Sequence, residues 1–187
     1  GANESTVSFT DDAWDIANFS DVAVPAGFNQ SSYIDYSDVG VLINNKAEAS
    51  RTIGWSFVNS RNIPLEHVLL WDKDGTPTGE TINRNQFNDF FAQPFREWIF
   101  NNSLDSELNF LVTTKGVPLK INGGNNKASF DNEIGLVGGT YDSYIGQDYW
   151  TDADYGPLAD NGNGKMEAFS REKHGFFLVT RLTGYTV

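Results

Sequence analysis

The sequence predicts an α/β fold: a three-layer sandwich in which helices cover a mainly parallel sheet. Two observations lead to this fold class. Four short apolar runs, typical of strands that are buried on both faces, occur between residues 39 and 180. Segments with helical periodicity and capping residues separate the first three of these runs. Strands and helices that alternate in this way form a parallel sheet, for which we expect the strand order 2-1-3-4.

The distribution of charge divides the chain into two parts. Residues 1–38 contain seven acids and neither Lys nor Arg, so we expect an extended, acidic N-terminal arm. Three apolar residues of this arm should pack on the domain: Trp14, Ile16 and Phe19. The alternative is a solvated acidic leader. The remaining residues, 39–187, then form one α/β domain.

The first strand is expected at residues 39–44 (VGVLIN) and the second at 67–71. Between them we expect a helix over 46–60. Asn45 is its predicted N-cap, and Glu48 stands three residues later at the capping-box position. Three apolar residues share one face of this helix: Ala49, Ile53 and Phe57.

A second helix is expected over residues 84–100, with Asn83 and Gln86 as its capping pair. Pro94 should kink or restart this helix, because proline removes one backbone hydrogen bond. The helix has an apolar face that we expect to be buried: Phe87, Phe90, Phe91, Phe95, Trp98 and Ile99. The third strand follows at residues 108–113.

Residues 128–137 predict a short helix with Ser129 at its N-cap. Two acids lie in its first turn, where the helix dipole favours them: Asp131 and Glu133. Residues 138–168 should form a loop, and the fourth strand is expected at 175–180. The sequence ends seven residues later, without a helix to cover that strand. We therefore expect an incomplete domain, the first half of a longer protein.

Ligands bind an open parallel sheet in the crevice beyond the carboxyl ends of its strands. Five residues near these ends are the predicted ligand-binding residues: Asn44, Asn45, Thr114, Lys115 and Arg181. Adding the two acids of the short helix, the candidate catalytic residues are Lys115, Asp131, Glu133 and Arg181. Because an unpaired charge at the end of a buried strand is costly, we expect Lys115 within about 4 Å of Asp131 or Glu133. The alternative to a functional role is that Lys115 pairs with one of these acids and only pins a loop.

An oxygen-rich stretch at residues 152–163 is a candidate calcium site. It contains five possible ligands: Asp152, Asp154, Asp160, Asn161 and Asn163. Calcium prefers such hard ligands, but their spacing is not that of an EF-hand, so solvated turns are the alternative. The chain contains no Cys, which excludes disulfides, thiolate nucleophiles and Cys-ligated zinc.

The charge and the composition also indicate the kind of partner and the cellular compartment to expect. A net charge of −12 repels phosphate, so nucleic acid is not an expected partner. No apolar run approaches the roughly 18 residues that a membrane-spanning helix needs. Four Asn-X-Ser sequons are possible N-glycosylation sites: Asn3, Asn18, Asn29 and Asn101. We therefore expect an extracellular or cell-surface protein.

Four segments of the chain resemble a family of uncharacterised, mostly secreted bacterial and archaeal proteins. They are SRNIPLEHVLLW, LVTTKGVPLKI, ASFDNEI and FFLVTRLTG. The similarity covers residues 39–185 and the first half of a typical member. It implies an α/β fold and secretion but no reaction, because the family has no established activity.

The order of elements also resembles that of caspase and gingipain-type peptidases. Those enzymes carry a His-Gly pair after the third strand and a Cys after the fourth. Lys115-Gly116 and Thr180-Arg181 stand at the corresponding places in this sequence. Since a guanidinium cannot replace a thiolate nucleophile, the resemblance implies a copy that has lost the peptidase dyad.

Three functional hypotheses follow. The first is a non-catalytic extracellular binding or cell-surface assembly module, whose partner is a second copy, the rest of a longer chain, or a glycan. The second is a hydrolase of caspase or gingipain-like fold, completed by a missing C-terminal half. The third is a calcium-dependent glycan-binding module with aromatic side chains as stacking platforms: Tyr141, Tyr144, Tyr149 and Trp150.

Overall fold

Four parallel strands form the central sheet of the structure, a computed structural model that describes residues 36–122, 128–146 and 169–183. The sheet has the order β2-β1-β4-β7, and all three neighbouring pairs are parallel. The strands are β1 (Val39–Asn44), β2 (Val68–Trp71), β4 (Phe110–Thr114) and β7 (Leu178–Leu182). This order is the predicted 2-1-3-4, so the predicted fold class is confirmed. Apart from its last three residues, the predicted arm at 1–38 lies outside the described residues.

The first crossover contains helix α1 (Glu48–Arg61). The predicted N-cap, Asn45, is wrong: the cap position is Ala47, which makes no side-chain hydrogen bond there. Instead, the neighbouring Asn44 accepts a hydrogen bond from the backbone amide of Lys46 at 3.1 Å. That bond orders the segment that leads into the helix.

The buried stripe of α1 also differs from the predicted one. It consists of three small or medium-sized residues: Ser50, Gly54 and Val58. Gly54 lies so close to the sheet that a Cβ atom there would come within 2.5 Å of Ile43 Cγ1. Small residues therefore let α1 approach β1 closely. The predicted apolar face of Ala49, Ile53 and Phe57 lies beside this stripe and is only half-buried.

The second predicted helix is present, in three parts: α2 (Arg84–Phe87), a π-helical turn (Asn88–Ala92) and α3 (Gln93–Asn101). The predicted capping box of Asn83 and Gln86 is confirmed, with two reciprocal hydrogen bonds of 2.9 Å. Pro94 falls in the first turn of α3, where its missing N–H is tolerated. The predicted restart of the helix at Pro94 is therefore confirmed.

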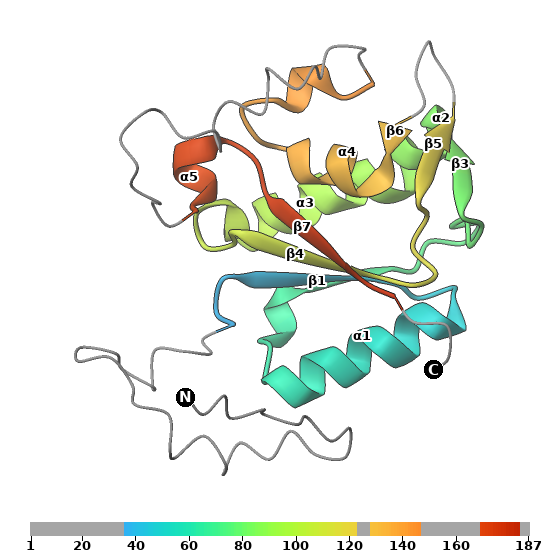
Figure 1. Cartoon of the computed structure of the whole chain (residues 1–187), viewed down its shortest axis with the longest axis horizontal. Helices are drawn as coiled ribbons and strands as arrows, with labels where there is room; N and C mark the ends of the chain where they lie inside the picture. Colours follow the sequence, from blue (N-terminus) through green and yellow to red (C-terminus); the bar gives the residue numbers. More distant parts are fainter. Residues whose placement is uncertain (1–35, 123–127, 147–168, 184–187) are drawn as a thin grey trace, which may run out of the picture. The chain divides into compact units, whose positions relative to one another are not determined.

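Helices cover the two faces of the sheet unequally (Figure 1). The chain steps from β1 to β2 in one direction, and to β4 and then β7 in the other. Right-handed crossovers that run in opposite directions place their helices on opposite faces. Accordingly, α1 lies on one face, and α3 and α4 (Phe130–Leu136) lie on the other.

The larger part of the core lies on the α3 and α4 face. Phe91 packs there edge-to-face against Trp71, at 4.9 Å between ring centres, and against Phe130, at 5.1 Å. A smaller core beneath α1 contains mainly β-branched residues: Val39, Val41, Ile43, Val58, Ile63 and Val112. The predicted burial of the second helix is confirmed for its central residues, whereas Phe90 and Trp98 are only partly buried.

Three short strands form a second sheet that the sequence does not predict. They are β3 (Thr81–Asn83), β5 (Lys120–Asn122) and β6 (Ala128–Ser129). The β3–β5 pair is parallel and the β5–β6 pair antiparallel. Strands of two or three residues are too short to show a period of two in the sequence.

The remaining helical segments in the described part of the chain are short. They are α5 (Arg171–His174) and three 3-10 turns: Leu65–His67, Leu104–Ser106 and Asp142–Tyr144. Ser129 occupies the N-cap position of α4 as predicted, but its side chain makes no capping hydrogen bond. The fourth predicted strand, at 175–180, begins three residues later in the structure, because α5 and its C-cap Gly175 occupy the preceding residues.

Candidate functional site

Asn44, at the carboxyl end of β1, is completely buried and makes only internal hydrogen bonds. Its side-chain amide donates to the carbonyls of Pro77, at 2.8 Å, and Gly116, at 3.0 Å. Its side-chain oxygen accepts from the Lys46 amide, and its own backbone N–H donates to Ser50 Oγ at 2.8 Å. Asn44 therefore joins the loops that follow β2 and β4 to the start of α1.

The Arg181 side chain, on β7, is one-tenth exposed and bonds to Asp131 on α4. Its Nε donates to Asp131 Oδ2 at 2.8 Å, and its Nη2 donates to Oδ1 at 2.5 Å. The same guanidinium donates to the carbonyls of Thr114 (3.2 Å), Val117 (2.8 Å) and Pro118 (2.8 Å). A guanidinium has five N–H donors, and these five bonds use all of them. Arg181 thus fixes the turn after β4 to both β7 and α4.

The register of the sheet explains why these groups meet. Thr113 on β4 is the direct neighbour of Arg181 on β7, so both side chains point to the α4 face. Asp131 lies in the first turn of α4 above them. The hydroxyl of Thr113 donates to Asp131 Oδ1 at 3.0 Å, which completes the pairing of this carboxylate.

Glu133, the second predicted acid, bonds to an arginine that sequence reasoning missed. Nη1 of Arg84 donates to Glu133 Oε2 at 2.7 Å, and Nη2 donates to Oε1 at 3.1 Å. The backbone amide of Gly146 also donates to this nearly buried carboxylate. One signal could have indicated the pair: Arg84 begins α2, where the helix dipole disfavours a cation, so an acid close by was to be expected.

Lys115 is exposed at the end of β4, and its backbone amide donates to the Leu182 carbonyl at 2.9 Å. The predicted pairing of Lys115 with Asp131 or Glu133 is corrected by the structure, in which arginines bind those two acids. Gly116 follows because the turn needs a positive φ of 96°, and a Cβ there would lie 2.8 Å from Ala47 Cβ.

Charged side chains also meet after β1 and β2. Lys46 Nζ lies 3.1 Å from Asp72 Oδ1 and 3.3 Å from Asp74 Oδ1. The pKa of Lys46 is raised, first by the hydrogen bond to Asp72 and then by that to Asp74. The pKa of Asp72 is lowered, first by a hydrogen bond from Asn45 and then by Lys46. Asn45, a predicted ligand-binding residue, therefore bonds to an acid of the neighbouring loop.

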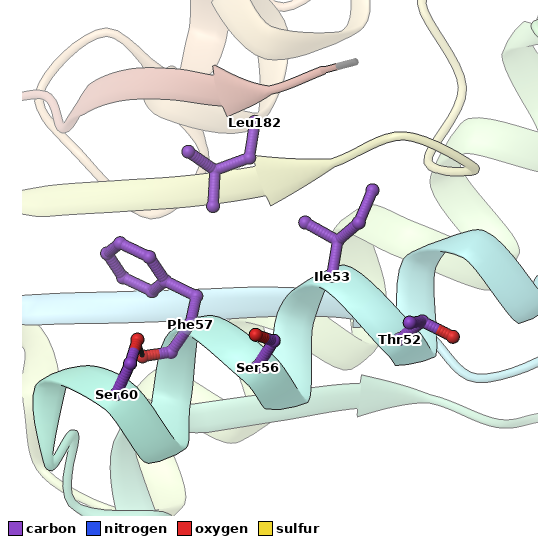
Figure 2. A pocket seen from close by; sticks show the side chains of 6 residues that line it. All are labelled: Thr52, Ile53, Ser56, Phe57, Ser60 and Leu182. Carbon is purple, nitrogen blue, oxygen red and sulfur yellow. Dashed lines mark hydrogen bonds between the residues drawn. The ribbon is translucent and has the colours of Figure 1, made fainter. Parts of the chain in front are cut away.

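An open groove of about 380 Å³ lies between α1 and β7 (Figure 2). Its lining contains no charged residue: Thr52, Ile53, Ser56, Phe57, Ser60 and Leu182. Ile53 and Phe57 point from α1 towards the sheet, and Leu182 points from the β7 end towards the helix. Sequence reasoning did not identify this groove. The available signal was that α1 carries two adjacent non-polar stripes, of which the sheet buries only one.

Aromatic side chains gather at the start of the predicted loop 138–168. The rings of Tyr141 and Tyr144 lie 6.0 Å apart, and Phe176 lies 6.3 Å from Tyr141. Tyr149 and Trp150, the other two predicted stacking residues, lie outside the described residues. The glycan-binding hypothesis stays a prediction.

The predicted calcium ligands lie outside the described residues: Asp152, Asp154, Asp160, Asn161 and Asn163. Within the described ranges, no three His, Asp or Glu side chains are arranged to hold a metal ion. Three of the predicted glycosylation sites, Asn3, Asn18 and Asn29, also lie outside, whereas Asn101 is the exposed last residue of α3. Among the helices that the structure describes, none is long and apolar enough to cross a membrane.

Comparison with known proteins finds no family model, no curated protein and no solved structure that matches this chain. The resemblance of its four segments to a secreted family therefore stays a prediction.

Proposed function

We propose that this chain is a non-catalytic binding or assembly module that contacts another protein through the groove between α1 and β7. The groove itself is the observation that carries the proposal. Ile53 and Phe57 are half-buried there, and Leu182 faces them across the opening. Covering these side chains with a partner would remove apolar surface from water, at about 25 cal/mol for each Å².

The charge pattern of α1 supports the same surface. Five residues of α1 line the groove, and none of them is charged: Thr52, Ile53, Ser56, Phe57 and Ser60. Charged residues make up 20% of the whole chain, and Arg51 lies on the opposite flank of the helix. The core of a protein interface is depleted of charge in this way, whereas a solvated helix face is not.

The hydrogen bonds of the sheet edge argue against the hydrolase alternative. A general acid or base must reach a proton of the substrate. All five donors of Arg181 are bound internally, and both oxygens of Asp131 accept from it. Glu133 is held by Arg84 and Gly146. These residues are better suited to fixing loops than to turning over a substrate.

We place this module outside the cell or at its surface. Asn101 supports this location, because its side chain is exposed and a glycan there would not disturb the core. The location is tested by mass spectrometry of the chain purified from its source, in which a glycan on Asn101 supports it and cytoplasmic recovery contradicts it.

Photo-cross-linking tests whether the groove binds a protein. A photoreactive amino acid is placed at Ser56, in the groove, or at Glu97, an exposed residue of α3 on the opposite face of the sheet. Each chain is irradiated with the cell-surface fraction of its source. We expect a discrete adduct from position 56 alone. Excess unlabelled wild-type chain should compete it away, and excess Ser56→Arg chain should not. Equal adducts from both positions, or none, would contradict the proposal.

A further inference from the structure

We infer that the partner protein binds as an extended strand, which adds to the open edge of β7 and places every second side chain over the groove. This inference rests on the proposed function and names the kind of partner: a strand with non-polar residues at alternate positions, in a positively charged protein. Its support comes from the backbone of β7, from the position of the groove and from the charge of the chain.

β7 is an edge strand of the central sheet. Among the strands that the structure describes, only β4 pairs with it. At its start, Leu178 donates its backbone N–H to the residue that precedes β4, and at its end the Leu182 carbonyl accepts from the residue that follows β4. Because backbone groups alternate in direction along a strand, those of Val179 and Arg181 point away from β4.

The backbone groups of Val179 and Arg181 form the open edge of the sheet. Within the described ranges, no backbone group bonds to them. Edge strands are commonly protected from pairing by a lysine or a proline, and β7 contains neither. Its one charged side chain, Arg181, is neutralised by Asp131. Another extended backbone is the partner that matches such a row of donors and acceptors.

The groove adjoins this edge. Leu182 points from β7 to the α1 face of the sheet, where it lines the groove together with Ile53 and Phe57 (Figure 2). Side chains alternate between the two faces of a strand, so a strand added beside β7 would present every second side chain to the same face. Non-polar side chains at those positions would cover Ile53 and Phe57 and remove them from water.

The net charge of the chain favours a partner of opposite sign. At −12, the chain attracts cationic proteins at long range and repels acidic ones, a second copy included. Because the lining of the groove is uncharged, the cations of the partner fit best at the positions that point away from it. The expected pattern is therefore an alternation of non-polar and basic residues.

Hydrogen exchange on the full chain tests the inference, with a synthetic peptide of alternating Lys and Val, blocked at both ends, as the probe. NMR follows the backbone amides one by one. In the free chain, we expect Val179 and Arg181 to exchange at least about tenfold faster than Thr180 and Leu182, because β4 protects only the latter two. The peptide should slow the exchange of Val179 and Arg181 by at least about tenfold.

Modified peptides separate backbone pairing from attraction by charge or by non-polar side chains. N-methylation removes the backbone donors, of all the Val residues in one peptide and of all the Lys residues in another. Only one edge of a bound strand faces β7, so one of these peptides should bind at least about tenfold more weakly and the other like the parent. A peptide of the same composition with Lys and Val in separate blocks should bind weakly, and so should one with Glu in place of Lys.

A substitution in the groove tests where the side chains of the peptide lie. Ser56→Arg should weaken binding of the peptide by about tenfold, because it places a bulky cation beside the open edge. The matched control is Asn101→Arg, which makes the same change of charge at the exposed end of α3, on the other face of the sheet. It should bind the peptide like the wild type.

Slow exchange of Val179 and Arg181 in the free chain would show that the edge is already covered, and this would overturn the inference. The same holds if the peptide slows neither amide, or if both N-methylated peptides bind like the parent. Equal binding of the Glu peptide would contradict a positively charged partner. These failures are distinct from failure of the proposed function, because a protein cross-linked at position 56 would still support the groove as a binding site.

Discussion

Arg181 on β7 and Asp131 on α4 are joined by two hydrogen bonds, of 2.8 Å from Nε and 2.5 Å from Nη2. The other three donors of the guanidinium hold the backbone of the turn that carries Lys115. One side chain therefore links an edge strand, a helix and a turn. This arrangement stabilises the carboxyl edge of the sheet, the place where sequence reasoning expected a ligand-binding site.

Replacing Arg181 with Met should lower the free energy of unfolding by about 3–5 kcal/mol, because Asp131 would lose its counter-ion in a mostly buried position. Chemical denaturation at neutral pH measures this loss. The control is Lys120→Met at an exposed position of β5, which should change stability by less than about 0.5 kcal/mol. A similar, small effect of both substitutions would mean that the Arg181 cluster is not structural.

The aromatic core makes a second prediction. Phe91 is fully buried between Trp71 and Phe130, so Phe91→Ala should cost about 3–5 kcal/mol in unfolding free energy. The control, Phe100→Ala, removes a ring of the neighbouring helix α3 that is 83% exposed, and it should be nearly neutral. If Phe91→Ala cost less than about 1 kcal/mol, Phe91 would not be packed in the core as described.

The third prediction concerns the protonation of Asp72. Its pKa lies below the ordinary value of 3.8, so the folded chain binds this proton less readily than the unfolded chain does. The Asp72 carboxylate therefore stabilises the fold above about pH 3.8, and this contribution is lost as the pH falls through the lowered pKa. Asn45→Ala should raise the pKa of Asp72 more than Lys46→Met does. A carboxyl-carbon NMR titration of each variant measures the pKa of Asp72. If Lys46→Met raised this pKa more than Asn45→Ala, the hydrogen bond from Asn45 would not be its main cause.

The sheet was predictable because its strands carry their signal locally. VGVLIN is apolar up to its last residue, Asn44, and every residue of β1 is buried in the structure. The direction of each crossover then follows from the handedness rule, which restricts the strand order. The capping box of Asn83 and Gln86 is equally local, since both partners lie within one turn of each other.

The partners of the site residues were not predictable in the same way. Asp131 and Arg181 are separated by 50 residues, and Arg84 and Glu133 by 49. Hydrophobic periodicity does not identify partners that are so far apart in the sequence. Sequence reasoning therefore placed the acids near the correct edge of the sheet and paired them with Lys115, because they are the first acids that follow this lysine in the sequence. The groove was missed for a related reason, because periodicity shows that α1 has a non-polar side without showing how much of it the sheet covers.

The reactivity of single cysteines in the chain at its native location tests the groove most directly. The chain contains no Cys, so Ser56→Cys in the groove and Glu97→Cys on α3, at the opposite face of the sheet, each introduce one thiol at an exposed position. If a protein covers the groove, a membrane-impermeant maleimide should react with position 56 at least about tenfold more slowly than with position 97, because burial removes a thiol from the reagent. The difference should vanish in denaturant. Equal rates at the two positions in the native state would show that the groove is open and that its proposed role is wrong.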